Sequence, residues 1–436
     1  MSGPRTTESV SPKLQRIAEL AQSDHSLRFT SLAHLLTTGF LKHNLKKLNR
    51  KAVSGIDKVT LEEYWQAADS RVQDLHDRLK SGRYRAQPVK RVYIPKANGK
   101  LRPLGIPTVE DRIVQRAVAE IIGTIYEPYF CEFSHGFRPK RSCHGALEEL
   151  RQIIDKEPVS VLVDADIKAY FDTVNHQWLL KFLSHRIADK TILRLVAKWL
   201  RSGIMENGVV CRNEEGTPQG GPISPLLANI YLHYVLDLWF VKRFSKNVRG
   251  VCKMVRYADD FVVCFQYRYE AVRFLKELRE RFREFNLELS EEKTRIIEFG
   301  KRTRNNGSIG AQSESRTFNF LGFTHYMRKI GKRGYRTARK PSRKSRDKFL
   351  RSIKEFVAEN RDMSVWWQAY RLKPKLKGYY NYFGLRYCKH ALRNVKWHTE
   401  RIWVRELRKR SQRHKLQWSR MRKYPWFNIL PEPTLR

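Results

Sequence analysis

Residues 252–265 read CKMVRYADDFVVCF. Two apolar runs rich in β-branched and aromatic residues, Cys252–Tyr257 and Phe261–Phe265, flank Ala258, Asp259 and Asp260. Such runs on either side of a short turn predict a β-hairpin, and this hairpin would present two carboxylates at its turn. An Asp-Asp turn is usually only solvated, so the hairpin alone does not indicate a site.

A second apolar run also ends at carboxylates. Residues 159–163 read VSVLV and lead into Asp164, Ala165 and Asp166. A buried strand that stops at an acid is a candidate for a site, because carboxylate oxygens are the ligands that hard divalent cations prefer. We expect Asp166, Asp259 and Asp260 to converge on one point.

The order of three stretches along the chain carries more information than any one of them. They are residues 166–172 (DIKAYFD), 216–225 (GTPQGGPISP) and 257–260 (YADD). The three resemble polymerase motifs A, B and C in the order that polymerases require. The set is similar to group II intron reverse transcriptases and maturases, and the resemblance extends from about Ser54 to about Phe383.

The resemblance implies an α+β fold of the right-hand polymerase type, with fingers, palm and a helical thumb called domain X. It also implies that Asp166 and Asp259 are the main metal ligands and Asp260 the third carboxylate, for two Mg²⁺ ions with Mn²⁺ as a substitute. Phosphodiester formation uses two such ions, one at the attacking hydroxyl and one at the triphosphate. Asp164 is not the expected ligand, because the motif places the ligand five residues before a bulky aromatic residue. That spacing fits Asp166 followed by Phe171.

Five residues are expected to hold or select the nucleotide, three of them outside the glycine-rich stretch. Phe171 would collide with a ribose 2′-hydroxyl and so select deoxynucleotides, whereas the alternative is an ordinary core aromatic. Lys96 and Arg102 lie on opposite arms of a hairpin expected between Tyr84 and Pro107, and they resemble the fingers residues that hold the triphosphate. Template phosphates are the alternative partner for such a basic hairpin.

In the glycine-rich stretch, Gln219 can hydrogen-bond a base or sugar edge, and Gly220 leaves room for nucleotide and template. A helix-capping loop would explain the glycines but not the whole string. Lys293, in residues 289–294 (LSEEKT), matches a motif D lysine that protonates the leaving pyrophosphate. Its alternative is a charge on a helix face.

The last third of the chain is basic and aromatic, with apolar spacing that predicts three helices. Residues 318–323 resemble a primer grip, and residues 374–383 resemble domain X, where aromatic rings can also serve the helical core. Five residues there are expected to bind RNA: Lys373, Lys375, Lys377, Tyr379 and Tyr382.

Composition agrees with a polyanionic partner. Lys and Arg number 86 against 44 Asp and Glu, for a formal net charge of +42, which exceeds what solubility requires.

The six cysteines form no CxxC pair, so neither a zinc knuckle nor a disulfide framework is indicated. With no apolar run long enough for a membrane span and no secretory signal, we expect a cytoplasmic protein of bacterial type, associated with the nucleoid.

The sequence predicts five regions. They are a loose tail (1–25), a basic N-terminal extension (26–80), fingers and palm (81–330), thumb or domain X (331–410) and a basic C-terminal segment (411–436). The paired cysteines and histidine cluster of an HNH-type endonuclease are not found in the sequence.

These observations indicate an RNA-directed DNA polymerase that assists splicing and retromobility of a group II intron by target-primed reverse transcription. The expected partners are structured intron RNA, an RNA template with a DNA primer, deoxynucleotides and a DNA target, without a membrane; a homodimer stays open. The alternatives are a free-standing relative in DNA repair or phage defence, and a maturase that binds RNA without polymerising.

Overall fold

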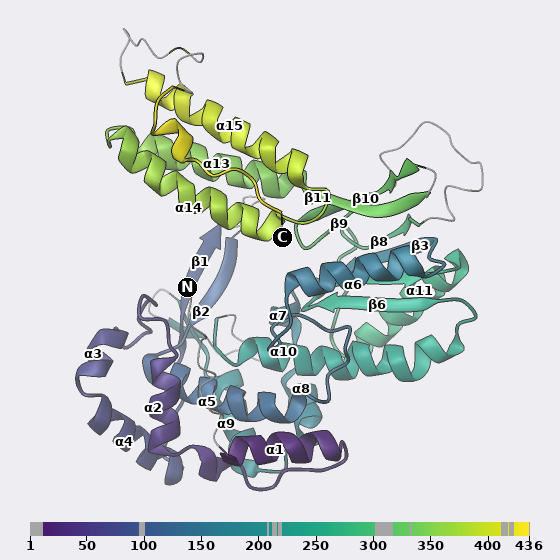
Figure 1. Cartoon of the computed structure of the whole chain (residues 1–436). Helices are drawn as coiled ribbons and strands as arrows, with labels where there is room; N and C mark the ends of the chain where they lie inside the picture. The colour runs from purple at the N-terminus through teal and green to yellow at the C-terminus, as the bar shows by residue number, and fades with distance from the viewer. Residues whose placement is uncertain are drawn as a thin grey trace. The chain divides into compact units, whose positions relative to one another are not determined.

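The computed structural model describes residues 12–95, 101–206, 209–211, 216, 220–300, 317–331, 334–410, 417 and 423–435. Of Arg102 and residues 209–211 it describes the backbone only. The chain forms two compact units (Figure 1). The first comprises Met1–Ala146, Ala165–Val263 and Tyr269–Arg295, and the second Leu147–Asp164, Cys264–Arg268 and Ile296–Arg436.

The first unit begins with helices that pack on one long apolar helix. These are α1 (Pro12–Ser23), α2 (Thr38–Lys46), α3 (Leu61–Gln66), α4 (Ala68–Lys80) and α5 (Val109–Tyr126). Both α1 and α2 pack on α5, whose Thr108 cap accepts a hydrogen bond from the amide of Asp111. Residues 12–23 therefore form a helix where the sequence predicted a loose tail.

The basic hairpin predicted between Tyr84 and Pro107 is confirmed as β1 (Val89–Pro95) and β2 (Leu101–Ile106), which pair antiparallel. They belong to a sheet in the order β2-β1-β4-β5, with β4 (Ile204–Glu206) and β5 (Val209–Cys211). The register sets Ile94 opposite Arg102.

A second sheet, in the order β6-β7-β3-β8, contains the acid-tipped strands. Its members are β6 (Cys252–Tyr257), β7 (Asp260–Phe265), β3 (Val161–Asp166) and β8 (Arg295–Glu298). Nearly all residues of β3 and β7 are buried, as their continuous apolar runs predict. The hairpin at residues 252–265 and the strand before Asp166 are thus confirmed.

Further helices lie between residues 143 and 284 of the chain. They are α6 (Cys143–Lys156), α7 (Tyr170–Thr173), α8 (His176–Ser184), α9 (Lys190–Arg201), α10 (Ser224–Leu232) and α11 (Arg268–Glu284). After α10 the chain continues through η2 (His233–Asp237), η3 (Phe240–Phe244) and η4 (Ser245–Asn247). The first two of these are π-helical, a rare conformation that often occurs at functional sites.

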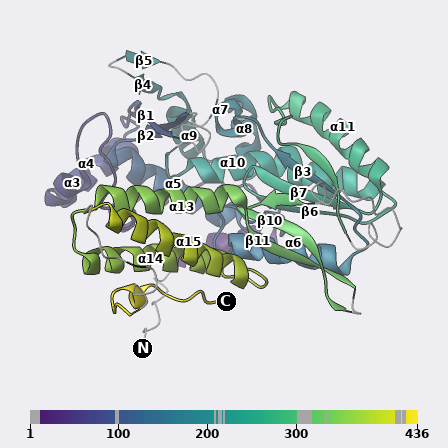
Figure 2. The same cartoon turned by 90° about the horizontal axis from the view of Figure 1, so that it is seen from above.

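The second unit contains the three predicted helices, α13 (Arg343–Glu359), α14 (Val365–Phe383) and α15 (Lys389–Arg408), side by side in both views (Figures 1 and 2). It also holds a sheet in the order β11-β10-β9, formed by β11 (Tyr335–Pro341), β10 (Phe323–Lys329) and β9 (Phe318–Phe320). The carboxylate of Asp155 accepts a hydrogen bond from the Thr337 amide at 2.9 Å, which ties β11 to the end of α6. Short η7 (Phe427–Ile429) packs on α14.

Candidate active site

The turn between β6 and β7 holds the two neighbouring acids. Ala258 has a φ of 58°, the left-handed region that tight hairpin turns require and that a residue with a Cβ seldom adopts. Asp259 and Asp260 are both partly exposed just beyond it. The turn is therefore a strained support that holds two carboxylates where solvent and ligands can reach them.

Asp166 lies at the matching end of the neighbouring strand β3. At the other end of the same pair of strands, the Ser160 amide donates to the Phe265 carbonyl at 3.0 Å. The start of β3 thus meets the end of β7, so the strands run antiparallel, and following both from this pair leads to Asp166 opposite Asp259. Asp164 is buried whereas Asp166 is partly exposed, which favours Asp166 as the ligand.

Lys293 lies directly beside Asp166. The Ser290 amide donates to the Asp166 carbonyl at 2.8 Å, and the Lys168 amide donates to the Glu288 carbonyl at 2.9 Å, so residues 288–290 continue the pairing beyond β3. This backbone pairing brings the Lys293 ammonium into an ion pair with Asp166 Oδ2. The structure therefore brings the proposed motif D lysine to the acidic site.

The three acids supply hard oxygen donors of the type that Mg²⁺ prefers. In the described part of the chain, no group of three His, Cys, Asp or Glu side chains is close enough to hold a metal ion. One Asp166 oxygen is paired with Lys293 instead. A cation bound there would replace the ammonium as the partner of Asp166.

Phe171 follows the acidic strand in the short helix α7. The chain turns into this helix at Ala169, which has a φ of 46°. Tyr170 is buried and donates its hydroxyl to the Ala228 carbonyl, whereas Phe171 is only partly buried. The Phe171 ring is therefore accessible on one side, as the proposed contact with a nucleotide sugar requires.

Glycines of the segment 216–225 lie against other backbone segments. A Cβ added to Gly216, which has a φ of 84°, would lie 2.9 Å from the Asp172 Cα atom in α7. A Cβ on Gly220 would lie 2.5 Å from the Gly105 carbonyl oxygen in β2. The backbone at Gly216 therefore lies directly against α7, and the backbone at Gly220 directly against β2. The sequence analysis did not assign these glycines a role in packing.

Several nucleotide-binding predictions fall where the structure gives no side chain. Lys96 and Gln219 lie outside the described residues, and Arg102 is described by its backbone alone. Gly220 is described and exposed.

The predicted RNA-binding residues of α14 divide between its faces. Lys375 and Lys377 are exposed and Lys373 is partly exposed. The ammonium of Lys375 lies over the Phe356 ring at 4.7 Å, on a different face from the other two. Tyr379 is buried with its ring 4.3 Å from that of Phe349, so in this structure it packs against α13 and does not face solvent.

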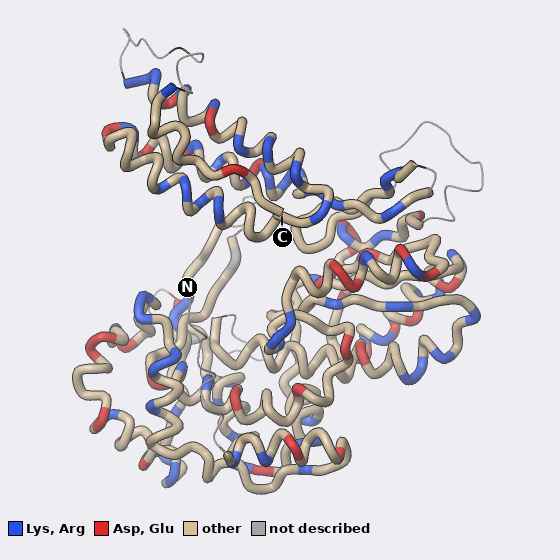
Figure 3. The backbone as a smooth tube through the Cα atoms, viewed as in Figure 1, with Lys and Arg blue, Asp and Glu red and all other residues tan. Residues whose placement is uncertain are grey.

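Tyr382 also serves the interior of the second unit, since its hydroxyl donates to the Leu321 carbonyl at 2.9 Å. Sequence reasoning missed two exposed rings, Trp366 and Tyr370. At 3.6 residues per turn they lie on the same face of α14 as Lys373 and Lys377. Lys and Arg recur along all three helices of this unit (Figure 3).

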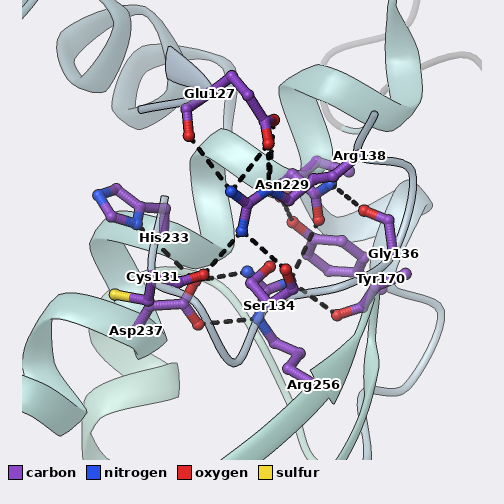
Figure 4. A network of polar contacts seen from close by, with 12 residues as sticks. Glu127, Cys131, Ser134, Gly136, Arg138, Tyr170, Asn229, His233, Asp237 and Arg256 are labelled. Carbon is purple, nitrogen blue, oxygen red and sulfur yellow. Dashed lines mark hydrogen bonds and ion pairs between the residues drawn. The ribbon is translucent and has the colours of Figure 1, made fainter. Parts of the chain in front are cut away.

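A buried ion pair behind the hairpin turn was also missed. Arg256, in β6, and Asp237, in η2, are both fully buried and joined through two hydrogen bonds (Figure 4). Burial opposes ionisation of Asp237, but the charge of Arg256, together with its hydrogen bonds and the neighbouring His233, outweighs burial and holds the pKa of Asp237 below its usual value. The signal in the sequence was a charged residue directly after the apolar pair Met254 and Val255 of this strand.

Comparison with known proteins identifies two domains. Residues 94–325 match the family described as reverse transcriptase (RNA-dependent DNA polymerase), and residues 346–424 match the group II intron, maturase-specific domain. The group II intron-encoded protein LtrA of Lactococcus lactis subsp. cremoris is 32% identical over 70% of this chain and 62% of its own length. Protein YkfC of Escherichia coli (strain K12) is 35% identical, over 62% of this chain and 79% of that protein.

A third relative, the putative COX1/OXI3 intron 1 protein of Saccharomyces cerevisiae, is 37% identical over 41% of this chain and 21% of its own length. The chain thus spans 62% of LtrA. In the part of the chain that the structure describes, no helix is long and apolar enough to cross a membrane.

The glycine contacts predict the effect of adding one methyl group. Gly216→Ala should destabilise the first unit by more than about 1 kcal/mol, because a Cβ at positive φ would also press on α7. The free energy of unfolding in denaturant measures this. Gly123→Ala in α5 is the control, since its Cβ would meet only Leu226 at 3.8 Å, and it should be neutral or stabilising. A Gly216→Ala protein as stable as wild type would contradict the close packing.

Proposed function

This chain belongs to the reverse transcriptases encoded by group II introns, and from that membership we propose that it is an RNA-directed DNA polymerase that also binds the RNA of a group II intron. The observation that carries the proposal is the antiparallel pairing of β3 with β7, which sets Asp166 opposite the Asp259–Asp260 turn within the matched region. In the full reaction the enzyme would copy intron RNA from a primer in a DNA target.

The proposed metal ligands are Asp166, Asp259 and Asp260, for two Mg²⁺ ions that Mn²⁺ can replace. When bound, such ions lower the pKa of the attacking hydroxyl and neutralise charge on the triphosphate. Lys293 would part from Asp166 as the site fills, which frees its ammonium to give a proton to the leaving pyrophosphate. The backbone pairing at Ser290 keeps Lys293 within reach throughout.

The nucleotide would lie between this site and the fingers hairpin. Lys96 and Arg102 would grip its triphosphate, and Gln219 with Gly220 would line its base or sugar. Phe171 would exclude a 2′-hydroxyl, since it lies five residues after Asp166 and its ring is partly exposed.

The RNA of the intron would bind the second unit on the exposed face of α14. Two rings and two cations share that face: Trp366 is 47% and Tyr370 62% exposed, and Lys373 and Lys377 follow them along the helix. Phosphate contacts supply affinity that salt weakens, and exposed rings stack on unpaired bases. This face replaces Tyr379 and Tyr382 in the proposal.

The first prediction concerns the metal ligands. Asp259→Asn keeps the shape of the side chain but removes its charge, so magnesium-dependent cDNA synthesis should be lost while RNA affinity stays nearly unchanged. Primer extension on an RNA template and filter binding measure the two. Glu288→Gln, which changes an exposed acid paired with Lys168, should retain activity. Extension at near wild-type rate by Asp259→Asn would refute the metal-site proposal.

Sugar selection gives a second prediction. Phe171→Ala opens space for a 2′-hydroxyl and should raise ribonucleotide use relative to deoxynucleotide use by about 10- to 200-fold, measured as the ratio of kcat/KM values. Tyr170→Phe is the control, because it removes the hydroxyl that reaches Ala228 but keeps both rings. Unchanged discrimination in a folded Phe171→Ala enzyme would limit that ring to packing.

A third prediction tests the α14 face. Changing Lys373 and Lys377 together to Gln should flatten the salt dependence of RNA binding by up to about two units of slope. Lys375→Gln should change it less, because that ammonium lies over Phe356. Wild-type affinity for a group II intron is then compared with that for an unrelated structured RNA of equal length at the same salt. Equal affinities would exclude the maturase role and leave a general reverse transcriptase.

A further inference from the structure

The guanidinium of Arg256 makes contacts to three different segments in the interior of the first unit (Figure 4). Its Nε donates to Asp237 Oδ1 at 2.8 Å, and its Nη2 donates to Asp237 Oδ2. Its Nη1 donates to Asn229 Oδ1 at 3.2 Å and to the Ala258 carbonyl at 2.9 Å. One buried cation therefore connects the π-helical turn η2, helix α10 and the turn that bears the acids.

The hydrogen bond from Arg256 to the Ala258 carbonyl acts directly on the turn that bears the acids. That carbonyl and the amide nitrogen of Asp259 belong to one rigid peptide plane. A charge-assisted hydrogen bond to the oxygen fixes the orientation of this plane, and with it the direction in which the Asp259 side chain leaves the backbone. The bond also acts on the residue with the strained φ of 58°, which needs support from its surroundings.

The opposite side of the same turn is held by a second segment. Asn229 Nδ2 donates to the Gly136 carbonyl at 2.6 Å. A Cβ on Gly136 would lie 2.3 Å from the Ala258 amide nitrogen, so residue 136 presses its backbone directly on the turn. The His135 amide also donates to the Arg256 carbonyl at 2.8 Å. Asn229 thus links the guanidinium and the Gly136 segment around one peptide.

Stability alone is a weak reason for such a pair. Removing two charges from water costs several kcal/mol each, and apolar residues of similar volume often stabilise a core as well or better. An ion pair differs from apolar packing in that its donors have fixed directions. Here one of those donors points at the peptide before Asp259.

We propose that Arg256 is a positioning residue, oriented by Asp237 and Asn229, that sets the geometry of the Asp259–Asp260 turn through the Ala258 carbonyl and thereby the metal affinity of the site. The inference rests on the proposed role of that turn as a metal ligand. Arg256 does not touch substrate; it acts through the backbone. Its loss should therefore change metal binding and turnover more than affinity for template and primer.

The experiment compares Arg256→Met, Arg256→Lys and Asn229→Ala with a matched control, Arg186→Met. Arg186 is equally a buried arginine of the first unit, but its guanidinium donates to the carbonyls of Ala21 and Asp24, away from the turn. Three quantities are measured on the full chain: Mn²⁺ affinity by electron paramagnetic resonance without substrate, thermal stability, and kcat and KM for primer extension.

Arg256→Met should weaken Mn²⁺ binding and lower kcat by about tenfold or more, the loss expected for one charge-assisted hydrogen bond, with KM for template and primer nearly unchanged. Arg256→Lys, which keeps a donor, should recover part of the loss. Asn229→Ala should show a smaller effect in the same direction, and it keeps the test decisive if Arg256→Met does not fold. Arg186→Met should lose stability but keep wild-type Mn²⁺ affinity.

Two results would overturn the proposal: folded Arg256 and Asn229 variants with wild-type Mn²⁺ affinity, or equal weakening of Mn²⁺ binding in Arg186→Met. A failure of the proposed function looks different. In that case the wild-type protein itself would bind Mn²⁺ no better than Asp259→Asn.

Discussion

Mutual repulsion of the carboxylates at the ends of β3 and β7 is the constraint that the rest of the first unit has to meet. Asp166 is offset by the Lys293 ammonium, which the pairing of residues 288–290 carries to it. The peptide before Asp259 is held by Arg256, and the charge of Arg256 is in turn matched by Asp237 where neither group is exposed. Two ion pairs therefore lie beside the acidic turn: Lys293 with Asp166, which are accessible, and Arg256 with Asp237, which are buried.

Close backbone approach is the second condition for this arrangement. Gly136 lies against Ala258, Gly216 against α7 and Gly220 against β2. At each place a single Cβ would come closer to backbone atoms than folded proteins allow. The site is thus assembled from segments far apart in the sequence, which meet through main-chain contacts. Glycine at these positions follows from the packing of the protein on itself.

Local patterns were enough to predict the hairpin at residues 252–265, the strand ending at Asp166, the fingers hairpin and the three helices of the second unit. Each depends on a period of two or 3.6 residues within one segment. Helix α1 was not predicted because only two of its residues, Leu14 and Ala21, are buried, so its apolar pattern is weak. The helix is stabilised by its packing on α5, which lies far away in the sequence. The burial of Tyr379 was not predicted, because nothing in the sequence of α14 indicates which of its aromatic rings packs on Phe349 of α13. Arg256 lies in β6 and Asp237 in η2. The spacing of residues within one element cannot predict an ion pair between two elements.

The charges of the chain serve two separate purposes. The formal net charge of +42 comes from side chains spread over the surface, which water and salt screen, so their effect on affinity falls as ionic strength rises. The charges of Arg256 and Asp237 are buried, where screening by salt is weak. Salt should therefore weaken the hold on RNA while leaving the geometry of the acidic turn intact. Binding and chemistry can then be separated by ionic strength, because the groups responsible for each differ in their access to water.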